Sequence, residues 1–308
     1  MNGSTEYFYD PIQSELLYLH RVTTYPLETI YHRHDAYEIY LFIRGNVNFY
    51  VENRCYHLEP GDLLIMSPEE MHRAFILDGT EYERITINLK KTYLCQLSTL
   101  STNLSACFDH RPKGQQNIVH LDDYHMKQIL HLTSELEELL DSNAYGTDVK
   151  TNAVIAQLLV LINNSFHNKS SIPIDIMPEM VRKTMDYIEA HISQEITLPK
   201  LAEAFYMNST YISRQFKKHT GLTIRSYIMN RRIELARYYL SGGMSITDAC
   251  FQSGFRDYAN FIRTFTKITG VSPGKYSRQA QNIPDPSFAH YAALNPAKDG
   301  QKLIDRFK

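Results

Sequence analysis

The sequence has only four cysteines and no long apolar run, and both scarcities exclude classes of protein. The cysteines are far apart and include no C-x-x-C pair, which argues against a zinc module, a dithiol redox centre and a disulfide scaffold. The most apolar stretch spans only residues 154–162, and the first ten residues lack the basic start and apolar core of a signal peptide. We therefore expect a cytoplasmic protein with reduced thiols and no membrane partner.

Charge is unevenly distributed along the chain, although the formal net charge is only −2. Residues 1–178 hold 13 basic and 23 acidic side chains, which gives a net charge of −10. Residues 179–282 hold 15 basic and 8 acidic side chains, a net charge of +7, and residues 283–308 hold 4 basic and 3 acidic side chains, a net charge of +1. A basic segment beside an acidic one indicates that the second part of the chain meets a polyanion, with a merely solvated basic surface as the alternative.

The apolar pattern changes along the acidic part. Short runs of β-branched and aromatic residues over about 18–89, separated by turn residues, predict an antiparallel sandwich or small barrel. Helical spacing then predicts helices over 122–142 and 148–167. Each helix has an apolar stripe that the barrel covers only in part, so we expect the uncovered part of the stripe to pair two chains. The alternative is that both helices pack only on their own barrel. A charge at Leu136 is then expected to weaken dimers more than it unfolds the domain.

The basic part contains two patterns of a helix-turn-helix. In EITLPKLAEAFYMNSTYISRQFKKHTG, Thr197 can cap a first helix whose first turn holds Pro199, and Asn208 and Ser209 can open a second helix. A similar unit follows in MSITDACFQSGFRDYANFIRTFTKITG. Two such units in series arise by chance much less often than one.

Apolar residues four apart predict a buried face on the second helix of each unit. Ile212 and Phe216 form this pair in the first unit, and Phe261 and Phe265 form it in the second. The opposite faces are polar and basic, so they are candidates to contact DNA. The candidate DNA-binding residues are Ser209, Thr210, Ser213, Arg214, Lys217 and Lys218 in the first unit and Asp257, Tyr258, Asn260, Arg263 and Lys267 in the second.

The segment between the units, TIRSYIMNRRIELARYYLSGG, predicts one helix that ends at Gly242 and Gly243. About 18 residues at 1.5 Å each make a rod of roughly 27 Å. This length is comparable with the roughly 34 Å between successive major-groove faces on one side of B-DNA. One chain could thus insert two recognition helices into adjacent grooves.

Residues 180–278 resemble the DNA-binding domain of the AraC/XylS family of bacterial transcription regulators. The segments LAEAFYMNSTYISRQFKKHTG, RRIELARYYL and GFRDYANFIRTFTKITGVSPGKYSR follow the family signature in order and spacing. Cys250 and Phe251 depart from the small residues that are usual there, and YANFIR replaces the usual SYFSR. The resemblance implies double-stranded DNA as a partner, and RNA polymerase as another if the protein is an activator. A helical bundle with a basic face is the alternative.

The earlier part of the chain resembles a cupin. His32, His34 and Glu38 in HRHDAYEIYLFIRG have the spacing of the first cupin motif. GDLLIMSPEEMH, which ends at His72, resembles the second, although its proline is displaced by one and a later glycine is absent. The four positions that ligate metal in catalytic cupins therefore hold residues that suit Fe(II), Mn(II) or Zn(II). A metal-dependent cupin enzyme, a dioxygenase or isomerase fused to a DNA-binding domain, is one interpretation.

The DNA-binding resemblance favours a sensor over that enzyme, since AraC-type regulators commonly carry a cupin-like domain around a small effector. Imidazole and carboxylate groups hydrogen-bond a polyol as readily as they bind a metal. We expect no catalytic residue and no cofactor, with a divalent metal at the four cupin positions as the alternative. Another alternative is a domain that binds no small molecule and only pairs subunits. The candidate effector-binding residues, for a sugar or related metabolite, are His32, His34, Glu38, Tyr40 and His72.

The predicted fold class is multidomain β plus α, and the expected function is sequence-specific transcription regulation by an effector-responsive homodimer. Two prolines mark the linker between the parts, and prolines also break up the carboxyl-terminal stretch. The predicted boundaries are 1–120 for the cupin-like β-barrel sensor, 121–167 for a helical dimerisation segment, 168–179 for the linker, 180–280 for the all-α tandem helix-turn-helix domain and 281–308 for a tail.

Overall fold

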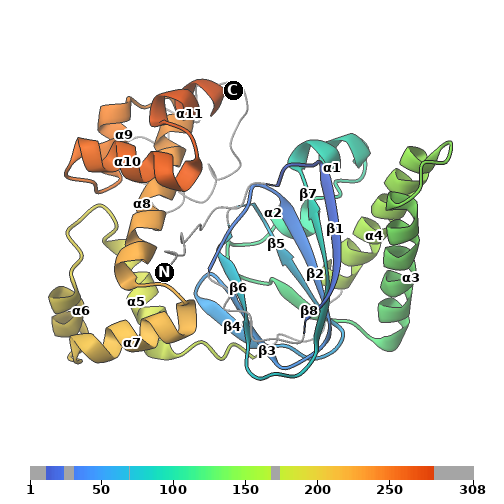
Figure 1. The fold of residues 1–308 in the computed structure, drawn as a ribbon, viewed down its shortest axis with the longest axis horizontal. Coiled ribbons are helices and arrows are strands. Elements are labelled where there is room, and N and C mark those ends of the chain that lie inside the picture. The colour runs from blue at the N-terminus through green and yellow to red at the C-terminus, as the bar shows by residue number, and fades with distance from the viewer. Residues whose placement is uncertain (1–11, 24–30, 69, 168–173, 281–308) are drawn as a thin grey trace. The chain divides into compact units, whose positions relative to one another are not determined.

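The computed structural model describes residues 12–23, 31–68, 70–167 and 174–280 (Figure 1). The described residues form two compact units. The first is rich in strands and holds residues 12–23 and 33–177 of the described part, and the second is mainly helical and holds residues 31–32 and 178–280. The predicted tail, 281–308, and the first six residues of the predicted linker, 168–179, lie outside the described residues.

Antiparallel strands build the first unit, as the short β-branched and aromatic runs predict. The strands are β1 (Leu16–Thr23), β2 (Tyr37–Arg44), β3 (Val47–Val51), β4 (Arg54–His57), β5 (Asp62–Met66), β6 (His72–Ile76), β7 (Tyr82–Leu89) and β8 (Ile118–His120). They form a five-stranded sheet in the order β1-β7-β2-β5-β8 and a three-stranded sheet in the order β4-β3-β6. Over the described residues these two sheets are not joined into a closed ring, so the predicted barrel is open.

Strand β2 is buried on both faces and separates two cores. Tyr37 and Leu41 pack in the core that includes the long helices of the unit. Tyr40 and Phe42 pack on the opposite face with Phe49 of the small sheet. Successive side chains of a strand point to opposite faces, which produces this division. We call the face of the five-stranded sheet that carries Tyr40 and Phe42 the interior face.

Four helices complete the first unit. They are α1 (Lys91–Leu97), α2 (Ala106–Asp109), α3 (Asp123–Leu140) and α4 (Thr147–His167). The predicted helices agree with α3 and α4 to within two residues, and Asp122 caps α3 by accepting a hydrogen bond from the His125 N–H at 2.8 Å. Both pack on the sheet face opposite the interior face (Figure 1). Leu136 is fully buried in that core, so the expectation that it lies at a dimer surface is wrong.

Helices alone account for residues 179–280 of the second unit, apart from short connections. They are α5 (Glu179–Ala190), α6 (Leu198–Phe205), α7 (Ser209–Thr220), α8 (Ile224–Ser241), α9 (Ile246–Gln252), α10 (Tyr258–Thr269) and α11 (Pro273–Ala280). Figure 1 shows α8 running from the group of α5, α6 and α7 to the group of α9, α10 and α11. Of its 18 residues, 13 are buried, so α8 is held from nearly every side.

Basic side chains of α8 make contacts within the second unit. Arg231 pairs with Glu189 of α5, with 2.5 Å between Nε and Oε1, and with Glu234 one turn further, with 2.6 Å between NH1 and Oε2. Arg232 donates from Nε to the carbonyl oxygen of Ile192 at 2.9 Å. These arginines contribute to the excess of basic residues in this part of the sequence, but their side chains hold the helices of the unit together.

Candidate effector site and nucleic-acid interface

Side-chain caps fix where the helices of both helix-turn-helix units begin. Thr197 Oγ1 accepts a hydrogen bond from the Lys200 N–H at 3.4 Å, which starts α6 as predicted. Asn208 Oδ1 accepts one from the Thr210 N–H at 2.8 Å and starts α7. Asp257 does the same for α10, with Oδ1 at 2.8 Å from the Asn260 nitrogen. The Asp257 carboxylate, predicted to contact DNA, is therefore already engaged within the protein.

The buried and exposed faces of α7 and α10 follow the predicted pattern. Ile212, Phe216, Phe261 and Phe265 are each fully buried. Apart from Ser209 and Ser213, which are half-buried, the candidate DNA-binding side chains are exposed to solvent. These exposed residues are Thr210, Arg214, Lys217 and Lys218 on α7, Asp257 at the cap, and Tyr258, Asn260, Arg263 and Lys267 on α10.

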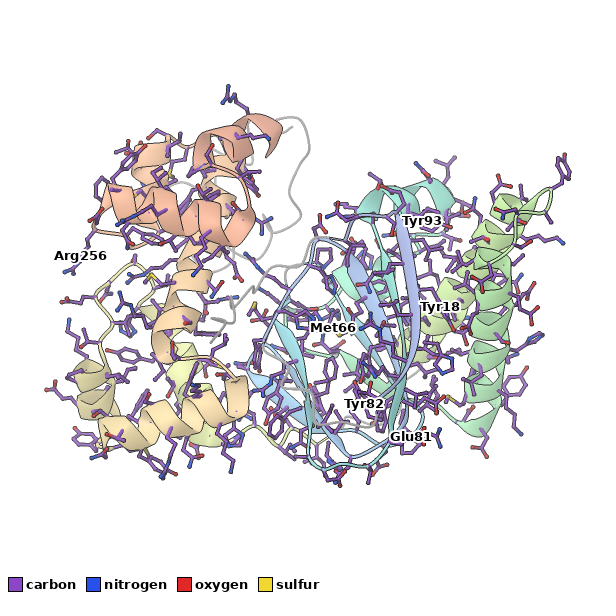
Figure 2. The ribbon with its side chains drawn as sticks, viewed as in Figure 1. Tyr18, Met66, Glu81, Tyr82, Tyr93 and Arg256 are labelled. Carbon is purple, nitrogen blue, oxygen red and sulfur yellow. The ribbon has the colours of Figure 1, made fainter. Side chains whose placement is uncertain are left out.

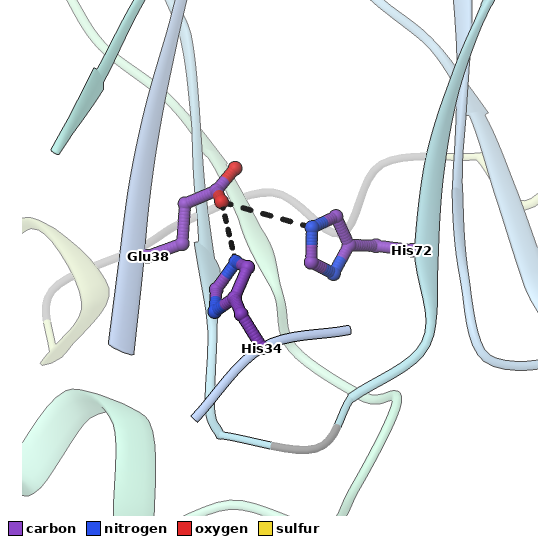
Figure 3. Close-up of side chains that lie close together, drawn as sticks. All are labelled: His34, Glu38 and His72. Atoms are coloured by element: carbon purple, nitrogen blue, oxygen red, sulfur yellow. Dashed lines mark hydrogen bonds and ion pairs between the residues drawn. The ribbon is translucent and has the colours of Figure 1, made fainter. Parts of the chain in front are cut away.

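Three side chains form a buried polar group in the first unit, which we call the His–Glu cluster: His34, Glu38 and His72 (Figure 3). Glu38 comes from β2 and His72 from β6, so the cluster bridges the two sheets. Glu38 Oε2 lies 2.7 Å from His34 Nε2 and 3.7 Å from His72 Nε2. None of the three is more than 6% exposed.

The second ring nitrogen of each histidine meets a backbone carbonyl. His34 Nδ1 lies 2.9 Å from the oxygen of Ala36, and His72 Nδ1 lies 2.9 Å from that of Glu70. Because a carbonyl oxygen only accepts hydrogen bonds, Nδ1 carries a proton in both rings. In a neutral ring, Nε2 would then be an acceptor that faces the Glu38 carboxylate, which is also an acceptor. Each Nε2 therefore needs a proton of its own, a hydrogen-bond donor or a cation at this place.

The charges of the cluster stabilise one another. Burial alone would raise the pKa of Glu38, but the imidazoles of His72 and His34 hold it far below its usual range. Burial alone would lower the pKa of His72, but the Glu38 carboxylate raises it. The cluster thus favours a carboxylate beside imidazole groups in the interior of the first unit. A few convergent polar groups among apolar side chains are typical of a small-molecule site.

The donor atoms of the cluster also fit a divalent cation. The three ligand atoms lie within 4.8 Å of one another, and two imidazoles with one carboxylate suit Fe(II), Mn(II) or Zn(II). Contacts from Nδ1 to backbone carbonyls are those that orient metal-binding histidines. His34, Glu38 and His72 would hold such a cation, which would supply an electrophilic centre.

His32 does not join the cluster, although the sequence pattern places it beside His34. The regular strand β2 begins only at Tyr37, after both histidines, so the two-residue period of a strand does not apply to His32 and His34. Within the described residues, the four-residue set expected from the cupin motifs is a set of three.

Two tyrosines extend the polar region of the interior face. Tyr40 shares this face with Glu38, as predicted, and its hydroxyl contacts the hydroxyl of Tyr82 on β7, labelled in Figure 2. Burial raises the pKa of Tyr82 to about 12, so this side chain keeps its hydroxyl proton. The ring of Phe49 lies 4.6 Å from the Tyr40 ring and 6.2 Å from that of His72. No pattern in the sequence indicates Tyr82, because its neighbours depend on strand register.

Both units match known families. Residues 17–159 match the AraC-like ligand binding domain, and residues 201–279 match a helix-turn-helix domain. The chain belongs to the AraC family of transcription regulators. The first unit of this AraC-family chain is therefore its ligand-binding domain, which we call the sensor, and the second is its DNA-binding domain. This pairing supports an effector-responsive regulator over a metal-dependent enzyme fused to a DNA-binding domain.

Some relatives of this AraC-family chain match most of its length, and others match about a third of it. The transcriptional activator RhaR of Escherichia coli (strain K12) is 24% identical over 253 residues, covering 80% of this chain and 86% of RhaR. ToxT of Vibrio cholerae is a solved structure with 12% identity and a TM-score of 0.37, covering 87% of this chain and 99% of its own. The C-terminal domain of AraT, a response regulator from Geobacillus stearothermophilus, has 30% identity and a TM-score of 0.33, covering 34% of this chain and 88% of its own.

None of the helices in the described part of this AraC-family chain combines the length and the apolar character that are needed to span a membrane.

Proposed function

We propose that the effector of this AraC-family regulator is a sugar or related polyol, bound by the His–Glu cluster and Tyr40. The observation that carries the proposal is the buried Glu38 carboxylate held between two imidazoles at the junction of the sheets. Carboxylate, imidazole and phenol groups all hydrogen-bond hydroxyls, and Phe49 supplies an apolar ring beside them. The chain senses this ligand and catalyses no reaction, and it works in the cytoplasm.

The test of this proposal is the thermal stability of the purified full chain with a panel of sugars and alditols. A ligand that binds only the folded state stabilises it by RT ln(1 + [L]/Kd), which is about 2.7 kcal/mol when its concentration is 100 times Kd. The correct ligand should therefore raise the melting temperature, and His34→Ala should remove that gain while leaving a folded protein. Stoichiometric iron, manganese or zinc in the purified protein, with loss of DNA binding on chelation, would replace the polyol by a metal.

Double-stranded DNA is contacted, in this proposal, by the exposed faces of α7 and α10. Arg214 and Arg263 reach base edges together with Thr210, Ser213, Tyr258 and Asn260, while Lys217, Lys218 and Lys267 contact phosphates. The length of α8 supports this arrangement, because 18 residues at 1.5 Å make a rod of about 27 Å between the two helices. Similarity to the activator RhaR supports activation as the output, with RNA polymerase as a further partner.

The same proposal makes the regulator a homodimer formed through the outer side of α3 and α4. Apolar side chains remain exposed there: Leu140 is 44% exposed, Val149 66% and Val160 43%. Val160 and Leu132 also line a shallow groove between the two helices. A second copy of the chain would cover this surface, because the core of the same helices already covers the opposite side.

A further inference from the structure

Asn88 of β7 is a buried amide for which the fold provides no complete set of partners. The residue is only 4% exposed, and its Oδ1 atom accepts no hydrogen bond from any described residue. An amide oxygen withdrawn from water without a donor destabilises the folded state, so such a group calls for an explanation. Neither cupin motif includes this position, and no other pattern in the sequence indicates it.

Strand register places Asn88 directly beside Glu38. The β2–β7 pairing sets Glu38 opposite Asn88, and the β1–β7 pairing sets Leu17 on the other side of Asn88. Residues directly opposite on antiparallel strands project to the same face, with Cβ atoms about 4.5–5.5 Å apart. Glu38 belongs to the interior face, where it meets His72. The Asn88 side chain therefore lies on the interior face, next to the His–Glu cluster.

The neighbours of Asn88 across the sheet cannot satisfy its oxygen. Leu17 is apolar and has no side-chain donor, and the Glu38 carboxylate is turned toward the His34 and His72 rings, with Oε2 2.7 Å and 3.7 Å from their Nε2 atoms. The Asn88 amide oxygen and the Glu38 carboxylate thus stand side by side on the interior face. A molecule that brings two hydrogen-bond donors to this face satisfies both of them at once.

We propose that Asn88 is a specificity-determining residue of the effector site, where its amide binds one hydroxyl of a neutral polyol while Glu38 binds a neighbouring hydroxyl. This inference rests on the function proposed above and narrows the ligand class. A carboxylate-bearing ligand such as a uronic acid or fatty acid is disfavoured, because its charge would face Glu38. A hydroxyl suits Asn88, because an amide both accepts from a hydroxyl and donates to it.

The side chains around this pair match such a ligand. The Phe49 ring lies close to the rings of both Tyr40 and His72, and it gives an apolar surface for the carbon–hydrogen face of a sugar ring. A site built to hydrogen-bond a hydroxyl strongly rejects an analogue that lacks this group, since its own buried polar groups are then left unpaired. Asn88 should therefore make the site bind a sugar more tightly than the deoxy form that lacks the hydroxyl contacted by Asn88.

The experiment compares the wild-type full chain with Asn88→Leu and with the control Asn143→Leu, which makes the same change at an exposed asparagine between α3 and α4. The probes are neutral aldopentoses, aldohexoses, 6-deoxyhexoses and alditols, the matching uronic acids, and zinc and manganese chloride. Melting temperature and calorimetric titration are measured for each. Wild type and Asn143→Leu should respond to the same neutral sugar, and Asn88→Leu should bind it about tenfold or more weakly.

Two further readouts separate a ligand contact from a structural role. Without ligand, Asn88→Leu should melt no lower than wild type, because leucine removes a buried oxygen that lacks a donor. Among monodeoxy forms of the active sugar, one should bind wild type and Asn88→Leu equally. If ligand-free Asn88→Leu melts at a lower temperature than wild type, or if it binds the sugar as tightly as wild type, Asn88 is not a ligand-binding residue. Either result leaves the polyol proposal itself standing. A wild-type response only to uronic acids or metal ions, or no response at all, overturns the polyol proposal itself.

Discussion

At the scale of single residues, Arg214 and Arg263 occupy corresponding exposed positions in α7 and α10. Arginine makes a bidentate contact to guanine, so we expect Arg214→Ala and Arg263→Ala each to cost roughly 1–3 kcal/mol of binding to the specific site. Each substitution should relax base preference in only one of two patches about one helical turn apart. Binding-site selection with both variants measures this directly.

Lysine substitutions supply the control for these arginines. Lys217→Ala and Lys267→Ala remove exposed charges suited to phosphate, so they should weaken binding to any sequence and flatten its salt dependence. If the arginine variants behave in the same way, with an unchanged preferred sequence in both patches, Arg214 and Arg263 contact only the DNA backbone.

Glu70 and Arg111 form a buried ion pair beside the His–Glu cluster, with 2.5 Å between Oε2 and NH2. Glu70 Oε1 also accepts a hydrogen bond from the Gly114 N–H at 2.6 Å. Removal of one partner leaves a buried charge without compensation, so Glu70→Ala should lower the free energy of unfolding of the sensor by about 3–5 kcal/mol. Urea denaturation checks the value, and Glu138→Ala, at an exposed carboxylate, should change it little. Equal effects of the two variants would show that the pair has no stabilising role.

At the scale of elements, Gly254 sets the turn between α9 and α10. Its φ of +91° is a conformation that other residues rarely adopt, and a Cβ there would lie 2.5 Å from the Ile192 carbonyl oxygen. Gly254→Ala should therefore destabilise the DNA-binding domain by at least about 1–3 kcal/mol. Gly243→Ala is the matched control, because Gly243 has a φ of +82° but no atom within 4 Å of a built Cβ. Thermal melts in which both variants lose the same stability would exclude the close approach to Ile192 as a cause.

Local signals in the sequence predicted several elements well. Thr197 and Asn208 act as caps, and the apolar pairs on α7 and α10 are buried, because both properties depend on residues within a few positions. Strand β8 was missed, since three residues are too few to show a period. Tyr82 and Asn88 were missed because their neighbours are set by the register of β7 against β2, which no local pattern of either strand specifies.

At the scale of the whole molecule, the outer surface of α3 and α4 is expected to hold two copies of the chain together. Val160→Glu places a charge on this surface, so it should shift the chain from dimer to monomer while the sensor keeps its melting temperature. Leu136→Glu is the contrasting variant, since Leu136 is fully buried and a charge there should unfold the sensor. Sedimentation velocity with and without DNA distinguishes the cases. A wild-type monomer at every workable concentration would contradict the dimer.

Helix α8 is held from nearly every side, so the recognition helices at its two ends keep one separation and one rotational offset. B-DNA turns by about 34–36° for each base pair, since a full turn takes 10–10.5 pairs. A single pair inserted between the two contacted patches would rotate one of them away from its helix. Promoters bound by this regulator should therefore tolerate a base substitution within a patch more readily than an insertion or deletion between the patches. The DNA-binding domain thus measures the spacing of its target as well as its base sequence.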